Sequence, residues 1–264
     1  MVVLDWAMAA LLDRIQEMEP AGRRRGRRRL RLDPPLPTIY AIGDVHGCFR
    51  QLLDAEARIR EDVKQSPGEA MIVYIGDYVD RGPDAAAVLD HLTKEHEDGL
   101  SRVALCGNHD DAFLNFIRDP LAWIYWLGPD FGGARTLASY GIDVEVVLEG
   151  GGGVLETVRN AIPQRHVDFL AGLPVCLEAG RYLFVHAGVR PGVSLDAQTD
   201  EDMIWIREPF LSVGPGLPLI TVHGHTPSAT PEFRPGRIGI DTGCFATGRL
   251  TVLKIDASGA ARVL

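Results

Sequence analysis

The sequence predicts an α/β fold, and two observations lead to that prediction. In the first half, three short apolar segments each precede a glycine, polar side chains and a helix-like stretch; they lie at 39–42, 71–75 and 103–106. Buried strands that alternate with helices indicate βαβ units and a parallel sheet. The second half instead has strand-like segments joined by short loops, at 182–185, 219–222, 238–240 and 249–253.

Length, charge and cysteine usage narrow the class of protein. The 264 residues suffice for one large domain or two small ones. No run of about 18 apolar residues is present, so we expect no transmembrane segment, and no secretory signal is visible. Four well-separated cysteines without a Cys-x-x-Cys pair predict reduced thiols in a cytoplasmic protein. The net charge of −9 argues against broad nucleic-acid binding.

Residues 1–37 are expected to form an N-terminal helix and a basic, proline-rich arm before the main domain at 38–264. Apolar residues at helical spacing predict the helix over 4–18. An arginine run at 23–31 and a proline-rich linker at 33–37 follow. The arginine run would suit an acidic surface, such as nucleic acid or anionic lipid. The alternative is an arm without a role in catalysis.

The helix-like stretches of the first half are predicted at 52–63, 85–92 and 112–117. Residues 120–162 then interrupt this alternation of strands and helices, and we expect a small, partly helical cap inserted there. It contains the aromatic residues Trp123, Tyr125, Trp126 and Phe131. These would form either an aromatic wall over a substrate or the small core of the cap itself, and we favour the core.

The turns that follow the first three predicted strands contain most of the candidate functional residues. They read Gly-Asp-Val-His-Gly at 43–47, Gly-Asp-Tyr-Val-Asp-Arg-Gly at 76–82 and Gly-Asn-His-Asp at 107–110. A single Gly-Asp after a strand is more often an ordinary turn or helix cap. Three such turns in order, at strand ends where open α/β sheets bind ligands, predict a functional site.

Strand-end histidines in the second half complete a set of candidate metal ligands. The set is Asp44, His46, Asp77, Asn108, His186 and His225. Carboxylate, imidazole and amide oxygen without thiolate suit a divalent first-row ion: Mn²⁺ is expected, with iron or zinc as alternatives. Six ligands exceed the need of one catalytic ion, so two ions bridged by a carboxylate are predicted. His223 could replace His225 or lie behind the ligands.

A phosphate ester fits this predicted site as substrate. A hydroxide that bridges two metal ions can attack phosphorus in line with the leaving group, so no covalent nucleophile is needed. Arg81 and Arg207 would bind the phosphate oxygens, together with Asn108. His109 would protonate the leaving group, and Asp80 would fix its tautomer. The alternatives are a surface ion pair between Arg81 and Asp80 and a structural salt bridge of Arg207.

Five motifs together resemble the phosphoprotein phosphatase family of the calcineurin-like metallophosphoesterases, most closely the bacterial and phage lambda-type serine/threonine phosphatases. They are the three turns above, His-Ala-Gly at 186–188 and Gly-His-Thr-Pro at 224–227, and the resemblance covers about 38–255. It implies a β-sandwich of two mixed sheets flanked by helices, with two metal ions.

The resemblance also implies a role for each site residue. One ion would be held by Asp44, His46 and Asp77, and the other by Asp77, Asn108, His186 and His225. His109 with Asp80 would form the acid pair, and Arg81 with Arg207 would form the phosphate clamp.

Two departures from the family pattern bear on the substrate. Asp110 stands where the eukaryotic protein phosphatases have Glu, which is similar to the symmetrical diadenosine tetraphosphate hydrolases, as is Asp-Thr-Gly-Cys at 241–244. Those hydrolases usually lack an acid at the position of Asp80, so its presence favours a phosphomonoesterase.

The function expected from the sequence is therefore the hydrolysis of phosphate monoesters, on phosphoserine or phosphothreonine in proteins. The alternative is a symmetrical dinucleoside polyphosphate hydrolase that uses the same metals. A scaffold or a nucleic-acid-binding module would need a missing metal ligand, and none is missing.

Overall fold

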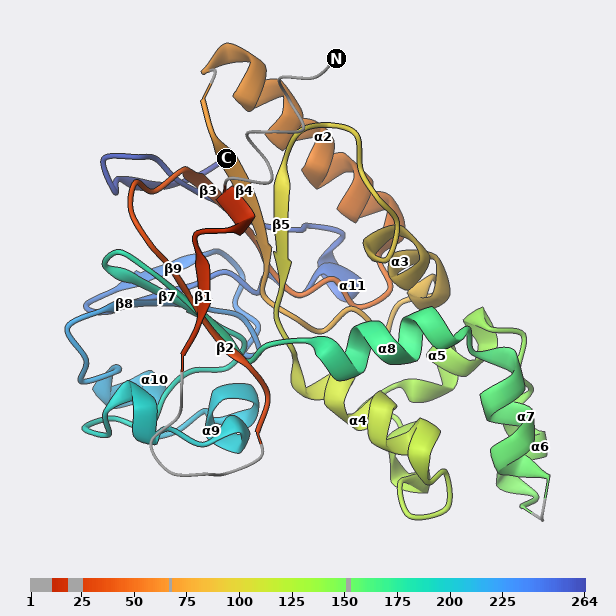
Figure 1. Ribbon diagram of the computed structural model, residues 1–264. Helices are drawn as coiled ribbons and strands as arrows, with labels where there is room; N and C mark the ends of the chain where they lie inside the picture. Colours follow the sequence, from red (N-terminus) through yellow and green to blue (C-terminus); the bar gives the residue numbers. More distant parts are fainter. Residues whose placement is uncertain (1–10, 19–25, 67, 151–152) are drawn as a thin grey trace.

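Two mixed β-sheets packed face to face, with helices on their outer sides, form the frame of the computed structural model (Figure 1). The structure describes residues 11–18, 26–66, 68–150 and 153–264. The seven-stranded sheet has the order β1 (Ile15–Glu17), β2 (Arg29–Leu32), β6 (Cys176–Ala179), β7 (Tyr182–Val185), β8 (Ile220–His223), β10 (Arg237–Gly239) and β9 (Glu232–Arg234). The five-stranded sheet has the order β12 (Ala261–Val263), β11 (Val252–Ile255), β3 (Thr38–Ile42), β4 (Ala70–Tyr74) and β5 (Ser101–Ala104). The α/β sandwich expected from the sequence is confirmed.

Strand β4 explains why its sequence is apolar at every position. It pairs in parallel with β3 on one side and β5 on the other. Met71 and Val73 pack into the core between the two sheets, whereas Ile72 and Tyr74 pack against the helices. A strand covered on both faces loses the usual alternation of apolar and polar residues. The carboxyl ends of all three parallel strands therefore lie on a rigid, buried base.

Four helices cover the outer face of the five-stranded sheet (Figure 1). They are α2 (Phe49–Gln65), α3 (Ala85–Leu92), α4 (Asn108–Arg118) and α8 (Gln164–Gly172). On the outer face of the seven-stranded sheet, a separate apolar cluster includes residues of the short helices α9 (Asp200–Trp205) and α10 (Phe210–Val213). The short helices η2 (Leu195–Ala197) and α11 (Cys244–Thr247) lie in loops.

The segment expected to form a cap is helical. It contains η1 (Ile124–Leu127), α5 (Gly133–Ser139), α6 (Val144–Leu148) and α7 (Val154–Ala161). Trp126 is fully buried and stacks on Phe113 of α4, with ring centroids 5.1 Å apart. The aromatic core of this segment is thus continuous with the core beneath α4.

The N-terminal segment departs from the predicted helix. Ile15–Glu17 form β1 and pair with β2 in antiparallel fashion, so the helix prediction for 4–18 was wrong at these positions; residues 1–10 lie outside the described part of the chain. Strand β2, from the end of the arginine run, pairs in parallel with β6. Leu30 and Leu32 are buried between the sheets. Pairing and burial of this kind override helical spacing, which is a weak local preference.

Three of the four described arginines of the run pair with acids within the chain, among them Arg31 with Glu178 at 3.0 Å. Arg27 pairs with Asp111 at 2.7 Å, and Arg29 with Asp200 at 3.3 Å. Arg28 is exposed and binds Gly172 O rather than an acid, so contact with an external acidic surface stays a prediction for Arg28 and for 23–25, which lie outside the described residues. The linker at 33–37 connects the two sheets, from β2 to β3.

The state of the four cysteines agrees with the prediction from the sequence. Cys48, Cys106, Cys176 and Cys244 are buried and unpaired, as predicted. No helix in the described part of the chain has the length and apolar character needed to cross a bilayer. The cytoplasmic location inferred from the cysteines stays a prediction.

The burial of β2 can be tested with Leu32→Ala. Leu32 is 1% exposed between the sheets, so we expect its truncation to lower the free energy of unfolding by ~2–5 kcal/mol. Urea denaturation followed by circular dichroism measures the change. Leu53→Ala, at a position that is 37% exposed on α2, is the matched control and should change stability by less than about 1 kcal/mol. Equal midpoints for the wild type and Leu32→Ala would contradict a structural role of β2.

Candidate metal centre

The predicted site residues meet where the parallel strands of the five-stranded sheet end. Asp44 and His46 follow β3, Asp77 follows β4, and Asn108 begins α4 after β5. The seven-stranded sheet contributes His186 after β7 and His225 after β8. All six candidate ligands are buried. Both sheets therefore direct polar groups to one place, as expected for strand ends in this class of fold.

Several of the predicted site residues also have an unusual backbone conformation. Among the described residues other than glycine, a positive φ occurs only at His46, Asp77, Asp80, Arg81 and His225, with angles between 44° and 70°. This left-handed conformation is uncommon for residues with a side chain and costs about 1 kcal/mol or more at each position. Each of the five is a site residue predicted from the sequence. Strain concentrated in this way is typical of a functional site.

Glycines next to the candidate ligands allow carboxylates to approach the backbone. A Cβ atom at Gly107 would overlap Asp77 Oδ1, and one at Gly224 would overlap Asp44 Oδ1. Any residue other than glycine would therefore displace a candidate ligand. This close approach gives a physical reason for the glycines in the motifs.

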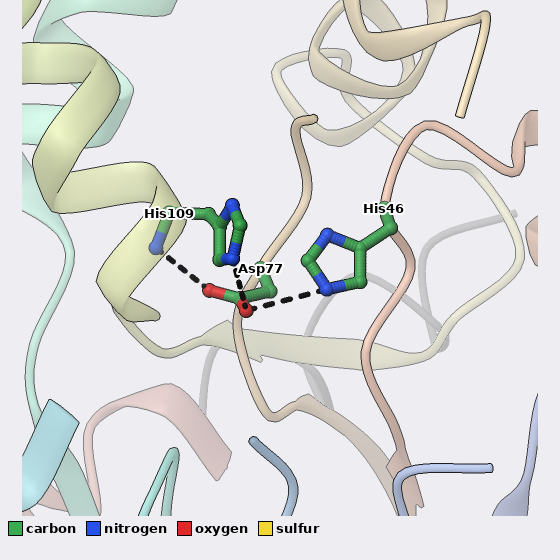
Figure 2. A group of neighbouring side chains, drawn as sticks. All are labelled: His46, Asp77 and His109. Carbon is green, nitrogen blue, oxygen red and sulfur yellow. Dashed lines mark hydrogen bonds and ion pairs between the residues drawn. The ribbon is translucent and has the colours of Figure 1, made fainter. Parts of the chain in front are cut away.

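Asp77 lies at the centre of the site (Figure 2). Its Oδ2 is 3.4 Å from His46 Nε2, and its Oδ1 is 3.4 Å from His186 Nε2. Two groups whose ligand atoms lie within 4.8 Å of one another share it: His46–Asp77–His109 and Asp44–Asp77–His186. Asp77 thus occupies the position predicted for a bridging ligand. In these groups Asp44 lies with His186 and His109 lies beside His46, and the assignment of ligands to the two ions stays a prediction.

The ring nitrogens of the three candidate histidine ligands have defined roles. Each ring has one nitrogen at hydrogen-bond distance from a backbone carbonyl oxygen: His46 Nδ1 to Val79 (2.9 Å), His186 Nδ1 to Ile75 (3.1 Å) and His225 Nε2 to Trp205 (3.2 Å). A neutral imidazole that donates through one nitrogen has a lone pair on the other. Burial lowers the pKa of all three, that of His225 to about 3, so the rings are neutral. Neutral imidazole is the form that binds metal ions.

Several acceptor atoms face each other without a proton between them. His186 Nε2 and His225 Nδ1 lie 2.9 and 2.8 Å from Asn108 Oδ1. Two lone pairs cannot satisfy one another, whereas a cation would bind both. Within the described part of the chain, Asp44 Oδ1 and His46 Nε2 are buried and have no hydrogen-bond partner. These residues therefore fit divalent metal ions.

The carboxylates of the site crowd one another. Burial, followed by the charges of Asp241 and Asp77, raises the pKa of Asp44 well above its usual value. Burial likewise raises the pKa of Asp241 to about 6. Bound cations would relieve the cost of burying these negative charges together. Asp241 had drawn notice in the sequence only as part of a family motif.

Asp110 supports Asp77 from behind. Its carboxylate accepts hydrogen bonds from the backbone amides of Asp77 (2.7 Å), Tyr78 (2.8 Å) and Gly107 (2.9 Å). These bonds join the turn after β4 to the turn after β5, and they hold Asp77 in its left-handed conformation. The residue that the sequence singled out as a family departure is thus a structural link between two ligand turns.

His109 and Asp80 form a buried pair. His109 Nδ1 lies 2.7 Å from Asp80 Oδ2. Burial lowers the pKa of His109, but the charges of Asp77 and Asp80 outweigh it and raise the pKa overall. Asp80 also accepts hydrogen bonds from Trp126 Nε1 (2.8 Å) and Thr136 Oγ1 (2.7 Å) of the cap segment. Sequence reasoning missed Thr136, since a lone threonine in a helix carries no signal of function.

The two predicted phosphate-binding arginines flank the ligands. Arg81 Nη2 is 3.2 Å from His109 Nε2, and its guanidinium lies 4.8 Å from the ring centroid of Phe245. The structure therefore does not pair Arg81 with Asp80. Arg207 is exposed, and after burial its charge is the next largest contribution that lowers the pKa of His225, which indicates that the two are near each other.

His223 is directed away from the candidate ligands. Its Nδ1 lies 3.1 Å from Gly224 O, and its Nε2 lies 3.3 Å from Arg237 Nη1. Its ring packs against Phe210, with centroids 5.0 Å apart. Both ring nitrogens thus have partners outside the site, unlike those of His225.

Comparisons with known proteins agree with this geometry. Residues 37–254 match the family model described as calcineurin-like phosphoesterase. A bis(5′-nucleosyl)-tetraphosphatase PrpE (asymmetrical) of Anoxybacillus flavithermus is 24% identical over 234 residues, which cover 81% of this chain and 88% of that relative.

Two solved structures share the fold. A candidate diadenosine tetraphosphatase has a TM-score of 0.61 and 21% identity, with 89% of this chain and 96% of that chain covered. A protein serine/threonine phosphatase of Saccharomyces cerevisiae has a TM-score of 0.51 and 15% identity, with 96% and 80% covered. At these identities the likeness concerns the fold alone.

The central position of Asp77 leads to a prediction for Asp77→Asn. Because the substitution removes a negative charge shared by both groups, we expect it to weaken the binding of both ions. Elemental analysis after dialysis against Mn²⁺ should find two ions per chain in the wild type and less than one in the variant. Asp84→Asn, at an exposed position in the same loop, is the control and should keep both ions. Full occupancy in Asp77→Asn would contradict the bridging role.

Proposed function

The chain belongs to the calcineurin-like phosphoesterase family, and on that premise we propose that it hydrolyses dinucleoside tetraphosphates asymmetrically. The observation that carries the proposal is the position of the histidine lone pairs. Those of His186 and His225 face Asn108 Oδ1, and that of His46 faces Asp77. This arrangement fits a pair of divalent ions. The choice of substrate is supported by the Anoxybacillus relative, which is named for this activity and matches over 88% of its own length. The sequence had favoured a phosphomonoesterase, with a symmetrical dinucleoside polyphosphate hydrolase as the alternative, whereas that relative is named as asymmetrical.

The six candidate ligands would hold two divalent ions, and Mn²⁺ is the proposed species. Iron and zinc suit the same donor set. When bound, such ions supply an activated water as nucleophile and offset the negative charge of the phosphate. The backbone carbonyls that bind the histidines fix the direction of each lone pair, so the chain would present its ligands already oriented.

The remaining site residues would act on the substrate directly. Arg81 and Arg207 carry permanent charges at the two ends of the ligand cluster, near His109 and His225 respectively. Each guanidinium can bind two phosphate oxygens at once, and Asn108 offers an amide beside them. His109 would hold a proton on Nε2 for the leaving group, while Asp80 binds Nδ1.

A phosphoserine or phosphothreonine phosphatase is the second candidate, and the His109–Asp80 pair favours it. An alkoxide leaving group needs a proton, whereas a nucleotide that leaves through its phosphate is a much weaker base and needs none. Asp80 itself does not decide between the candidates. It is 0% exposed and bonded to His109, Trp126 and Thr136, so it can affect a substrate only through His109.

The proposal can be tested by product analysis. Metal-stripped protein with and without Mn²⁺ is incubated with diadenosine tetraphosphate or with a phosphothreonine peptide, and the products are separated by chromatography. We expect Mn²⁺-dependent release of ATP and AMP. Two molecules of ADP would instead indicate the symmetrical type. Phosphate release from the peptide alone would favour the second candidate, and no turnover of either substrate would overturn both.

The role of His109 predicts a difference between the two kinds of substrate. For His109→Asn, we expect kcat on the phosphothreonine peptide to fall by roughly 10²–10⁴. The rate on diadenosine tetraphosphate should fall by less than about tenfold, because its leaving group needs no proton. Unchanged Mn²⁺ content is the control that separates proton donation from metal binding. An equal loss on both substrates would contradict this division of roles.

A further inference from the structure

We propose that Trp205, whose ring meets that of Phe131 nearly edge-on, forms a platform on which a nucleobase of the substrate stacks, while Arg207 binds the adjoining phosphate. This inference rests on the proposed hydrolysis of a nucleotide substrate and names the part of the site that would recognise it. Nothing in the metal-ligand set distinguishes a nucleotide from any other phosphate ester. Recognition must therefore come from residues at the rim of the site.

Trp205 is a large aromatic residue exposed beside the candidate ligands. Its side chain is 38% exposed at the end of α9. Its ring lies 6.0 Å from that of Phe131 at an angle of 73°, and 6.3 Å from that of His225. Phe131 in turn lies 5.1 Å from His109. The two aromatic rings thus join the outer surface to both the predicted acid and a predicted metal ligand.

Trp205 and Arg207 are exposed on either side of a buried residue. Ile206 between them has extended geometry, with φ −61° and ψ 138°, and its side chain is buried in the cluster beneath the seven-stranded sheet. His225 Nε2 binds Trp205 O at 3.2 Å and fixes this segment to the site.

An aromatic face two residues from a guanidinium matches the chemistry of a nucleotide. A nucleotide presents a flat π-face and a phosphate joined by one ribose, and stacking on aromatic rings accepts any base. Tyr125 is exposed and lies 6.0 Å from Phe131, which extends the aromatic surface outward. Tryptophan and tyrosine at such positions combine a large contact area with little loss of conformational freedom.

The other exposed aromatic residue of the site is less suited to this role. The ring centroid of Phe245 lies 5.5 Å from that of His46. The guanidinium of Arg81 already lies over its ring, 4.8 Å from the centroid. One face of Phe245 is therefore occupied by a cation–π contact, whereas the contacts of Trp205 with Phe131 and His225 are nearly edge-on.

A pair of ligands that differ only in the base tests the platform. Isothermal titration calorimetry of the Mn²⁺-loaded full chain compares AMP with ribose 5-phosphate, and chromatography afterwards checks that both ligands are intact. We expect the wild type to bind AMP roughly tenfold or more tightly, the ratio that stacking of one base provides. In Trp205→Ala this ratio should approach one, and Trp205→Phe should retain most of it.

Two further variants separate the roles of the base and the phosphate. Arg207→Ala should weaken both ligands alike and leave their ratio unchanged. Phe233→Ala removes an aromatic residue that is 52% exposed on β9 and should change neither affinity. Equal affinities of the wild type for the two ligands, or a full AMP preference in a folded Trp205→Ala variant, would overturn the inference. Because binding is measured, this result is independent of whether diadenosine tetraphosphate is hydrolysed.

Discussion

The buried carboxylate of Asp77 is the constraint on which the site depends. A charged group removed from water must be compensated by partners, and the start of α4 contributes one. His109 donates its backbone N–H at 3.0 Å, and the imidazoles of His46 and His186 lie at each side. Gly107 leaves room for the carboxylate. The parallel pairing of β3, β4 and β5 keeps these groups in register, so the rigid sheet fixes the geometry of the site.

The cap segment and helix α4 act on this site together. Trp126 packs on Phe113 and Phe116 of α4, with ring centroids 5.1 and 4.6 Å away. Its indole N–H reaches Asp80. The helix that begins with Asn108 and the acid that binds His109 are thus fixed by one aromatic contact. The sequence offered two interpretations of the cap aromatics, and each describes part of the segment: Trp126 lies in the core, and Phe131 contacts His109.

Features encoded within a few adjacent residues could be predicted from the sequence, whereas features that depend on residues far apart in the chain could not. The strand–glycine–ligand turns were visible because a buried strand, a close approach of the backbone and a ligand all leave marks within a few adjacent residues. Strands β1 and β2 were not, because β1 pairs with β2, and the pairing of β2 with β6 joins positions about 150 residues apart along the chain. Thr136 and Trp205 were missed for the same reason: their importance comes from Asp80 and His225, which are distant in sequence.

The separation between the metal centre and its rim bears on how such a site acquires specificity. Phosphate esters and phosphoanhydrides present the same tetrahedral phosphorus to the metal ions, so the buried ligands need not change when the substrate does. In the proposed function, proton donation is the one step near the centre that distinguishes the two, since only a poor leaving group would need a proton from His109. In the same proposal, selection beyond that step falls to exposed residues, which are aromatic on the side of Trp205. Substitution there can alter the substrate without loss of the buried, strained turns on which the ligands depend.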